Sequence, residues 1–117
     1  MQYIFLIYAP ESSDPPAASE PAFEQMLTAH RRFAEDAMQS GVFKSGAGLR
    51  SIGSATTVRM RNGDRMVTDG PFGETREHLG GFYILECRDL DEAVDYAARI
   101  PGVERGSIEV RPTLGDM

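Results

Sequence analysis

Hydrophobic and polar positions along these 117 residues follow two spacings, the alternation typical of strands and the three-to-four-residue recurrence typical of helices. Residues 2–9 are rich in aromatic and β-branched side chains and stop at Pro10, which predicts a first strand. A helix is then predicted from the capping residue Ser19 to Gly41, where glycine ends it. Its apolar side comprises Phe23, Met26, Leu27, His30, Phe33, Ala34, Ala37 and Met38.

Two strands joined by a tight turn are predicted in the middle of the chain. Residues 56–60 and 65–68 flank Asn62 and Gly63, a favoured pair for a two-residue turn because both positions must tolerate positive φ. Before this hairpin, residues 42–52 predict a bent or bulged strand, because glycines interrupt their pattern. The turn predicts cross-strand pairs of Val58 with Val67 and of Thr57 with Thr68.

A strand, a helix and a further strand are predicted in the last third of the chain. Residues 82–87 return as a strand, and residues 107–111 alternate apolar with charged side chains as the last one. Between them Asp89 caps a helix, with Glu92 three residues later as its capping-box partner. The apolar side of that helix extends to Ile100.

This order of elements is the split βαβ pattern of a ferredoxin-like sandwich. We therefore predict an α+β fold with an antiparallel sheet. The length and the 41% apolar content suit one domain, which we place at residues 1–112, followed by a flexible tail at residues 113–117.

Both faces of the predicted sheet carry large apolar side chains, whereas two helices can cover only one face. Leaving a large apolar side chain in water costs about 1.5–3 kcal/mol, so a second covering layer is needed. We predict a homodimer packed sheet to sheet, and the alternative is that residues 45–54 fold over the second face. The two sets on the first strand are Tyr3, Phe5 and Ile7, and Ile4, Leu6 and Tyr8.

Composition narrows the classes of partner and compartment. The net charge of −6 repels phosphate backbones and anionic membranes, so we expect no nucleic-acid and no membrane partner. Cys87, the single cysteine, lies in an apolar run and is interpreted as a small core residue in a reducing compartment. The apolar run at residues 3–9 is too short to span a bilayer. We expect a cytoplasmic protein.

The candidate chemistry lies in residues 68–82, where a strand ends, a turn follows and a strand returns. Asp69 can fasten the turn through backbone N–H groups, or face a cavity as an acid. In the same loop Arg76 could grip a carboxylate ligand and Glu77 could polarise a substrate, although solvated ion pairing is the commoner role. No motif for a metal or a cofactor accompanies them, and Gly46-Ala47-Gly48 is interpreted as backbone geometry.

The signature Asp69-Gly70-Pro71-Phe72, with the Thr-Arg-Glu and Gly-Gly-Phe elements after it, resembles the DGPF branch of the YciI-related proteins over most of the chain. The resemblance implies a dimeric α+β barrel, in which two ferredoxin-like units place their sheets face to face. It also implies a pocket with a histidine and an aspartate, and one relative resembles a chloromuconolactone dehalogenase. Some members are encoded near, or fused to, sigma-factor-like proteins.

His30 could serve as a general base if Asp69 oriented its ring, with Glu77 as a further acid or base. The alternative is a structural role, in which His30 lies in the core and its ring donates a hydrogen bond to a backbone carbonyl. Three functions then stay open. The chain is a small enzyme doing acid/base chemistry on a cyclic or carbonyl metabolite, a non-catalytic ligand-binding or regulatory module with a protein partner, or a structural dimer whose signature loop serves packing alone. The residues predicted to bind the ligand are Phe72, Thr75, Arg76 and Gly81.

Overall fold

The computed structural model describes residues 1–10, 20–73 and 76–116. The helices are α1 (Pro21–Gln39) and α2 (Leu90–Ala97), and a short 3-10 turn, η1, spans Ile52–Ser54. The strands are β1 (Gln2–Pro10), β2 (Phe43–Gly48), β3 (Thr56–Arg61), β4 (Asp64–Asp69), β5 (Glu77–Glu86) and β6 (Ser107–Pro112).

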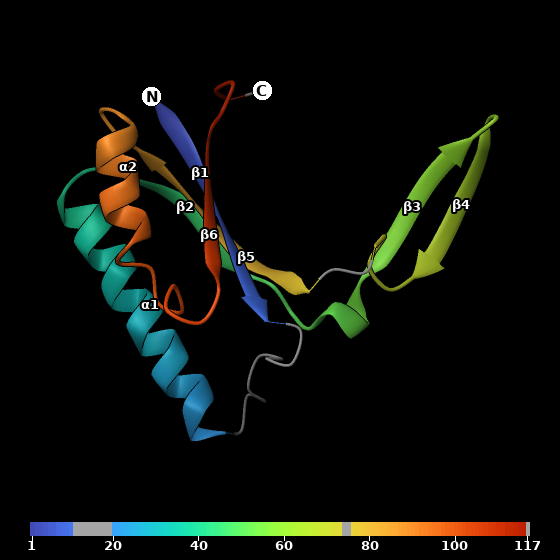
Figure 1. The fold of residues 1–117 in the computed structure, drawn as a ribbon, viewed down its shortest axis with the longest axis horizontal. Helices are drawn as coiled ribbons and strands as arrows, with labels where there is room; N and C mark the ends of the chain where they lie inside the picture. Colours follow the sequence, from blue (N-terminus) through green and yellow to red (C-terminus); the bar gives the residue numbers. More distant parts are fainter. Residues whose placement is uncertain (11–19, 74–75, 117) are drawn as a thin grey trace.

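The main sheet has four antiparallel strands in the order β2-β5-β1-β6. Strand β5 lies between β1 and β2, so the two strands that α1 connects are not neighbours. This is the split βαβ arrangement, and it confirms the predicted ferredoxin-like α+β fold. Both helices pack on the same side of the sheet (Figure 1).

Helix α1 begins at Pro21 and follows an N-cap residue, Glu20, whose side chain makes no capping hydrogen bond. The predicted cap, Ser19, lies outside the described residues. The helix ends as predicted, because Gly41 adopts a φ of 77°, a left-handed conformation that glycine takes without strain. Of the predicted apolar stripe, Met38 is the exception, since its side chain is exposed.

Helix α2 is capped as predicted. The Asp89 carboxylate accepts a hydrogen bond from the Glu92 N–H at 2.9 Å, and the Glu92 carboxylate accepts one from the Arg88 N–H at 3.0 Å. The helix ends at Ala97, however, three residues before the predicted end at Ile100. Ile100 still packs in the core from the turn that follows.

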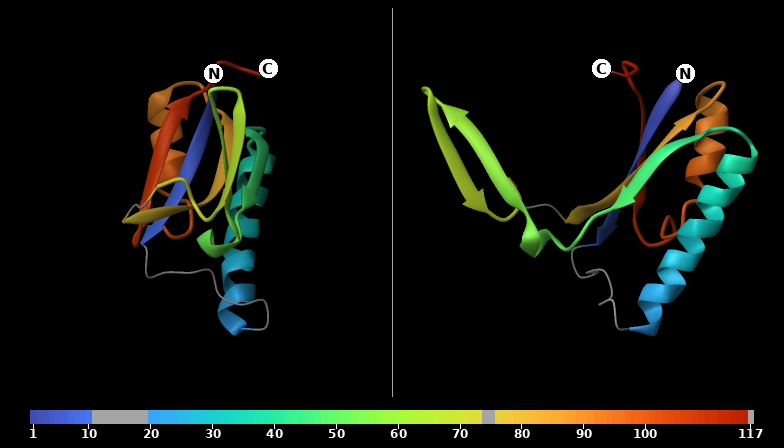
Figure 2. Two further views of the ribbon diagram at one scale, coloured as in Figure 1. Left: turned by 90° about the vertical axis from the view of Figure 1, so that its right-hand side faces the viewer. Right: turned by 180° about the vertical axis from the view of Figure 1, so that it is seen from behind.

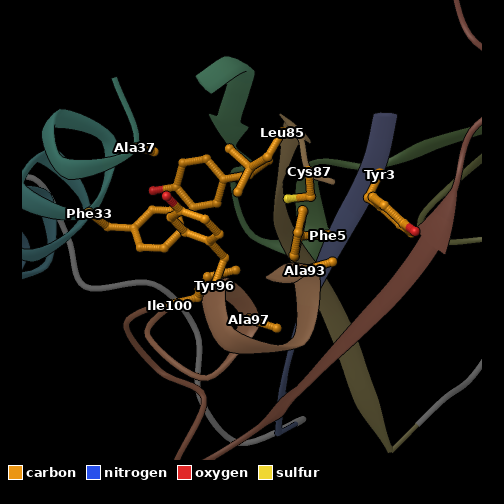
Figure 3. Close-up of a cluster of buried hydrophobic side chains, with 11 residues drawn as sticks. Tyr3, Phe5, Phe33, Ala37, Leu85, Cys87, Ala93, Tyr96, Ala97 and Ile100 are labelled. Atoms are coloured by element: carbon orange, nitrogen blue, oxygen red, sulfur yellow. The ribbon is translucent and has the colours of Figure 1, made fainter. Parts of the chain in front are cut away.

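The hydrophobic core lies between the helices and one face of the sheet (Figure 3). The first strand contributes Tyr3 and Phe5 to it, as the alternation predicted, and α1 contributes Phe33. Tyr83 packs against Phe33 with ring centroids 4.8 Å apart. The buried apolar residues are Tyr3, Phe5, Phe33, Ala37, Tyr83, Leu85, Cys87, Ala93, Tyr96, Ala97 and Ile100.

The opposite face of the sheet, called here the open face, is also apolar at its centre. Ile4 pairs with Ile84 and Leu6 pairs with Phe82, and all four side chains remain partly exposed. No helix in the described part of the chain covers this face (Figure 1). The alternative that residues 45–54 fold over it is wrong for their first part, because residues 45–48 belong to β2 within the sheet.

Strands β3 and β4 form a separate two-stranded hairpin that projects from the main sheet (Figure 2). Its register is the predicted one, with Val58 opposite Val67 and a turn at Asn62 (φ 53°) and Gly63 (φ 82°). The radius of gyration is 15.9 Å, larger than the roughly 13 Å of a compact domain of this length. Neither of the described helices is long and apolar enough to cross a membrane.

Candidate functional site

A groove of about 420 Å³ lies at one end of the main sheet, where β1 ends and β5 and β6 begin. Antiparallel pairing brings the strands together there, because Tyr8 of β1 lies opposite Ser107 and Pro10 lies opposite Glu77. The groove is shallow and largely open to solvent. Its lining residues are Tyr8, Arg76, Glu77, Ser107, Ile108 and Glu109.

The groove contains a positioned carboxylate and an arginine. The Ser107 hydroxyl donates a hydrogen bond to Glu77 Oε1 at 2.9 Å, which restrains that carboxylate at the start of β5. Arg76 immediately precedes it and is exposed. A guanidinium can bind a carboxylate ligand through two parallel hydrogen bonds, and a neighbouring glutamate can exchange a proton with the same ligand. Two of the predicted site residues, Arg76 and Glu77, are therefore in one groove.

His30 faces the sheet from α1, as the helical spacing predicted, and its partner is a side chain. His30 Nδ1 lies 2.7 Å from the Tyr83 hydroxyl. Burial lowers the pKa of His30 below 6.5 and raises the pKa of Tyr83 to about 12, so both are neutral near pH 7. A neutral imidazole has one protonated and one unprotonated ring nitrogen, so the tautomer of His30 decides which of the two groups donates this hydrogen bond.

The structure does not bring Asp69 to His30. Asp69 is the exposed last residue of β4, and the hairpin stands on the opposite side of the sheet from α1 (Figure 1). Asp69 does not fasten the turn either, because its carboxylate has no hydrogen-bond partner among the described residues. The Gly70 N–H donates to the Ala55 carbonyl at 2.7 Å, and the Thr57 hydroxyl donates to the Gly70 carbonyl at 2.7 Å.

The other predicted ligand contacts are dispersed. Phe72 is 80% exposed, and its carbonyl accepts a hydrogen bond from Arg59 at 3.1 Å. Gly81 is buried in β5, where a Cβ atom would lie 2.8 Å from the Ala47 carbonyl oxygen. This glycine therefore permits close approach of β2 and β5. Thr75 lies outside the described residues.

Sequence reasoning missed three side chains of these sites. Alternation along the returning strand puts Tyr83 on the same face as Leu85, and that signal could have suggested Tyr83 as a core neighbour of His30. Tyr8 and Ser107 meet only through the pairing of the first strand with the last. No local pattern specifies that register.

The described residues offer no cluster of three or more histidine, cysteine, aspartate or glutamate side chains that could hold a metal ion. Cys87 is buried, which raises the pKa of its thiol to about 11, with a further contribution from Glu92. The thiol is therefore protonated near neutral pH, in agreement with its interpretation as a core residue.

Comparison with known proteins places this geometry in a family context. A family model described as the YCII-related domain matches residues 1–114. Among curated proteins, the uncharacterized protein R00369 of Rhizobium meliloti (strain 1021) is 48% identical over 61 residues. That match covers 50% of this chain and 49% of the Rhizobium protein, so the chain spans about half the length of the relative.

Proposed function

The chain belongs to the YCII-related domain family, and we propose that its groove binds a small anionic carbonyl metabolite and transfers a proton on it. The observation that carries this proposal is the meeting of Arg76, Glu77 and Ser107 at one end of the sheet. The family match agrees with the resemblance drawn from the signature at residues 69–72. It does not name a reaction.

The groove residues suit proton transfer next to a carbonyl group. Arg76 would anchor a carboxylate of the metabolite by bidentate hydrogen bonding. Glu77 would take a proton from the carbon beside the carbonyl and return it, so that the reaction needs no oxidant or other co-reactant. Ser107 would act as a positioning residue, because its hydroxyl holds one oxygen of the Glu77 carboxylate at 2.9 Å.

The size and walls of the groove favour a small metabolite. A volume of about 420 Å³ lies toward the lower end of the roughly 300–1,000 Å³ typical of ligand pockets. Tyr8 and Ile108 supply an aromatic and an aliphatic wall beside the charged groups. Such a site favours a short carbon chain or a single ring that carries one carboxylate and one carbonyl group.

We also propose that the molecule is a homodimer, with the open face as part of the interface. Ile4, Leu6, Phe82 and Ile84 are partly exposed at the centre of that face. Apolar groups gathered on one surface of a soluble domain favour association. A second copy would provide the covering layer for this face.

The binding step can be tested with pyruvate, 2-oxoglutarate and muconolactone as probes, monitored by thermal shift and calorimetry. Arg76→Gln should weaken binding of the carboxylate probes about tenfold or more, since a charge-assisted contact is worth about 1.5–3 kcal/mol. Arg32→Gln, on the exposed side of α1, is the matched control and should bind normally. Failure of all three probes to bind, or equal loss in both variants, would contradict the proposal.

The proton-transfer step can be tested separately by NMR, as exchange of solvent deuterium into the carbon beside the probe's carbonyl. Glu77→Gln should bind the probe yet lose this exchange, whereas Glu35→Gln, exposed on α1, should retain it. Binding without exchange in the wild-type protein would refute catalysis. That result would favour the alternative of a ligand-sensing module that acts on a protein partner.

A further inference from the structure

We propose that the β3–β4 hairpin is a clasp that docks on a second copy of this chain. The proposal rests on the homodimer proposed above, and it is independent of the ligand groove. One face of the hairpin carries an apolar strip, in which Val58, Met60 and Val67 are 59%, 58% and 56% exposed. Met66 is exposed on the other face.

The hairpin lacks the support that such a structure needs. Its strands pair only with each other, in a sheet separate from the main one. A lone two-stranded hairpin is at best marginally stable in water, and stability requires further strands or a packed face. None of the residues of β3 and β4 is buried. An apolar strip on an unsupported hairpin therefore indicates a docking surface that another molecule completes.

The four apolar side chains at the centre of the open face supply only part of the apolar area that a stable interface buries. A fully exposed apolar side chain presents on the order of 100–200 Å². Because Ile4, Leu6, Phe82 and Ile84 are already partly buried, together they expose on the order of 200 Å². Stable interfaces bury about 800 Å² per partner. Somewhat more than half of that area is non-polar. The apolar side chains of the hairpin, together with Phe72, supply a few hundred Å² more, so the two surfaces together match the apolar part of such an interface.

Charge favours a second copy as the occupant. The hairpin carries three arginines, Arg59, Arg61 and Arg65, and two aspartates, so its formal charge is +1. The net charge of the whole chain is −6, so the remaining residues carry −7. A basic clasp is thus complementary to the acidic body of another copy. A nucleic acid would attract the same arginines but would be repelled by the body.

The placement of the hairpin suits reciprocal docking. It stands on the same side of the main sheet as the open face, and the two diverge from the η1 region (Figure 2). A second copy that enters this space contacts both the hairpin and the open face. It also offers its own hairpin and open face to the first copy. Under twofold symmetry each hairpin contacts the partner while receiving the partner's hairpin. Both apolar surfaces are then covered with no surface left over to propagate into a fibre.

The test compares two aspartate substitutions at matched exposure. Val67 on the hairpin is 56% exposed and Val94 on α2 is 51% exposed. Sedimentation should show the wild-type protein at twice its 12.9 kDa mass at micromolar concentration. Val67→Asp should weaken dimerisation about 100-fold or more, because each of two symmetric contacts loses apolar burial and gains a desolvated charge. Val94→Asp should dimerise normally.

Intermolecular nuclear Overhauser effects in mixed isotope-labelled protein then locate the contact. Methyl groups of Val58 and Val67 should show contacts to the other copy. A wild-type protein that stays monomeric, equal dissociation constants for the two variants, or a dimer without hairpin contacts would each overturn the clasp. Circular dichroism of both variants checks that they fold. The probe-binding assays remain readable in a monomer, so failure of the clasp is distinguishable from failure of the ligand site.

Discussion

The helix-covered side of the sheet and the hairpin side are built from similar alternating patterns, yet they differ in what completes them. On the helix side, α1 and α2 bury aromatic and aliphatic groups to near-zero exposure. On the hairpin side, Val58 and Val67 pair as predicted and remain more than half exposed. An alternation of two residues therefore predicts a strand and its register. The elements that cover the strand are set by tertiary packing.

The largest difference between the two regions should appear when an apolar side chain is shortened. Leu85 is fully buried on the helix side, so Leu85→Ala should lower the free energy of unfolding by about 2–5 kcal/mol. Val67→Ala should cost less than about 0.5 kcal/mol when urea unfolding is followed at sub-micromolar protein, below the dimerisation range. Similar losses in both variants would remove the contrast between the regions.

A second contrast lies within β2, between two glycines. A Cβ atom at Gly46 would lie 2.6 Å from Tyr83 Cδ1 and 3.0 Å from the Phe82 carbonyl oxygen, whereas nothing lies within 4 Å of one at Gly48. Gly46→Ala should therefore lower the free energy of unfolding by about 1–3 kcal/mol. Gly48→Ala should change it by less than about 0.5 kcal/mol. Urea titration of both variants measures the difference, and equal stability would show that the Tyr83 ring can shift freely.

The contact between His30 and Tyr83 should contribute less. Tyr83→Phe removes the hydroxyl 2.7 Å from His30 Nδ1 and leaves that nitrogen without its hydrogen-bond partner. The expected loss is about 1 kcal/mol in the free energy of unfolding. Tyr8→Phe, at the groove, is the matched control for a lost tyrosine hydroxyl. A fully stable Tyr83→Phe variant would mean that water replaces the hydroxyl without cost.

The smallest effect is a pH dependence on the helix side. Burial lowers the pKa of folded His30 below its usual 6.5, so between those two values the unfolded chain binds more protons. The free energy of unfolding should therefore fall as the pH drops from 6.5 toward the folded pKa of His30. Above pH 6.5 His30 is neutral in both states and no longer makes stability depend on pH. His30→Gln should flatten this slope, and His78→Gln should not. An unchanged slope in His30→Gln would show that other groups set the pH dependence.

Much of the fold could be predicted because its signals are local. The turn at Asn62-Gly63, the stop at Gly41 and the cap at Asp89 each depend on residues a few positions apart. The premature end of α2 and the separation of the hairpin from the main sheet could not be predicted in this way. Both are decided by tertiary packing, which periodicity does not report.

The candidate site was predicted in part for the same reason. Arg76 and Glu77 are neighbours in sequence, so the loop that suggested them also placed them in one groove. The proposed pair of His30 with Asp69 required a long-range contact, and it failed because the hairpin carries Asp69 away from α1. His30 instead contacts Tyr83, which lies in the core on the helix side of β5.

Hydrogen exchange at two protein concentrations tests most directly whether one region is self-sufficient and the other is completed by a second copy. Backbone amides in α1 and α2, on the side of the sheet away from the proposed interface, should be protected equally at low and high concentration. Those of β3 and β4 should exchange rapidly in the dilute monomer and become protected as the concentration rises through the dimerisation range. Hairpin protection that is independent of concentration would contradict the account.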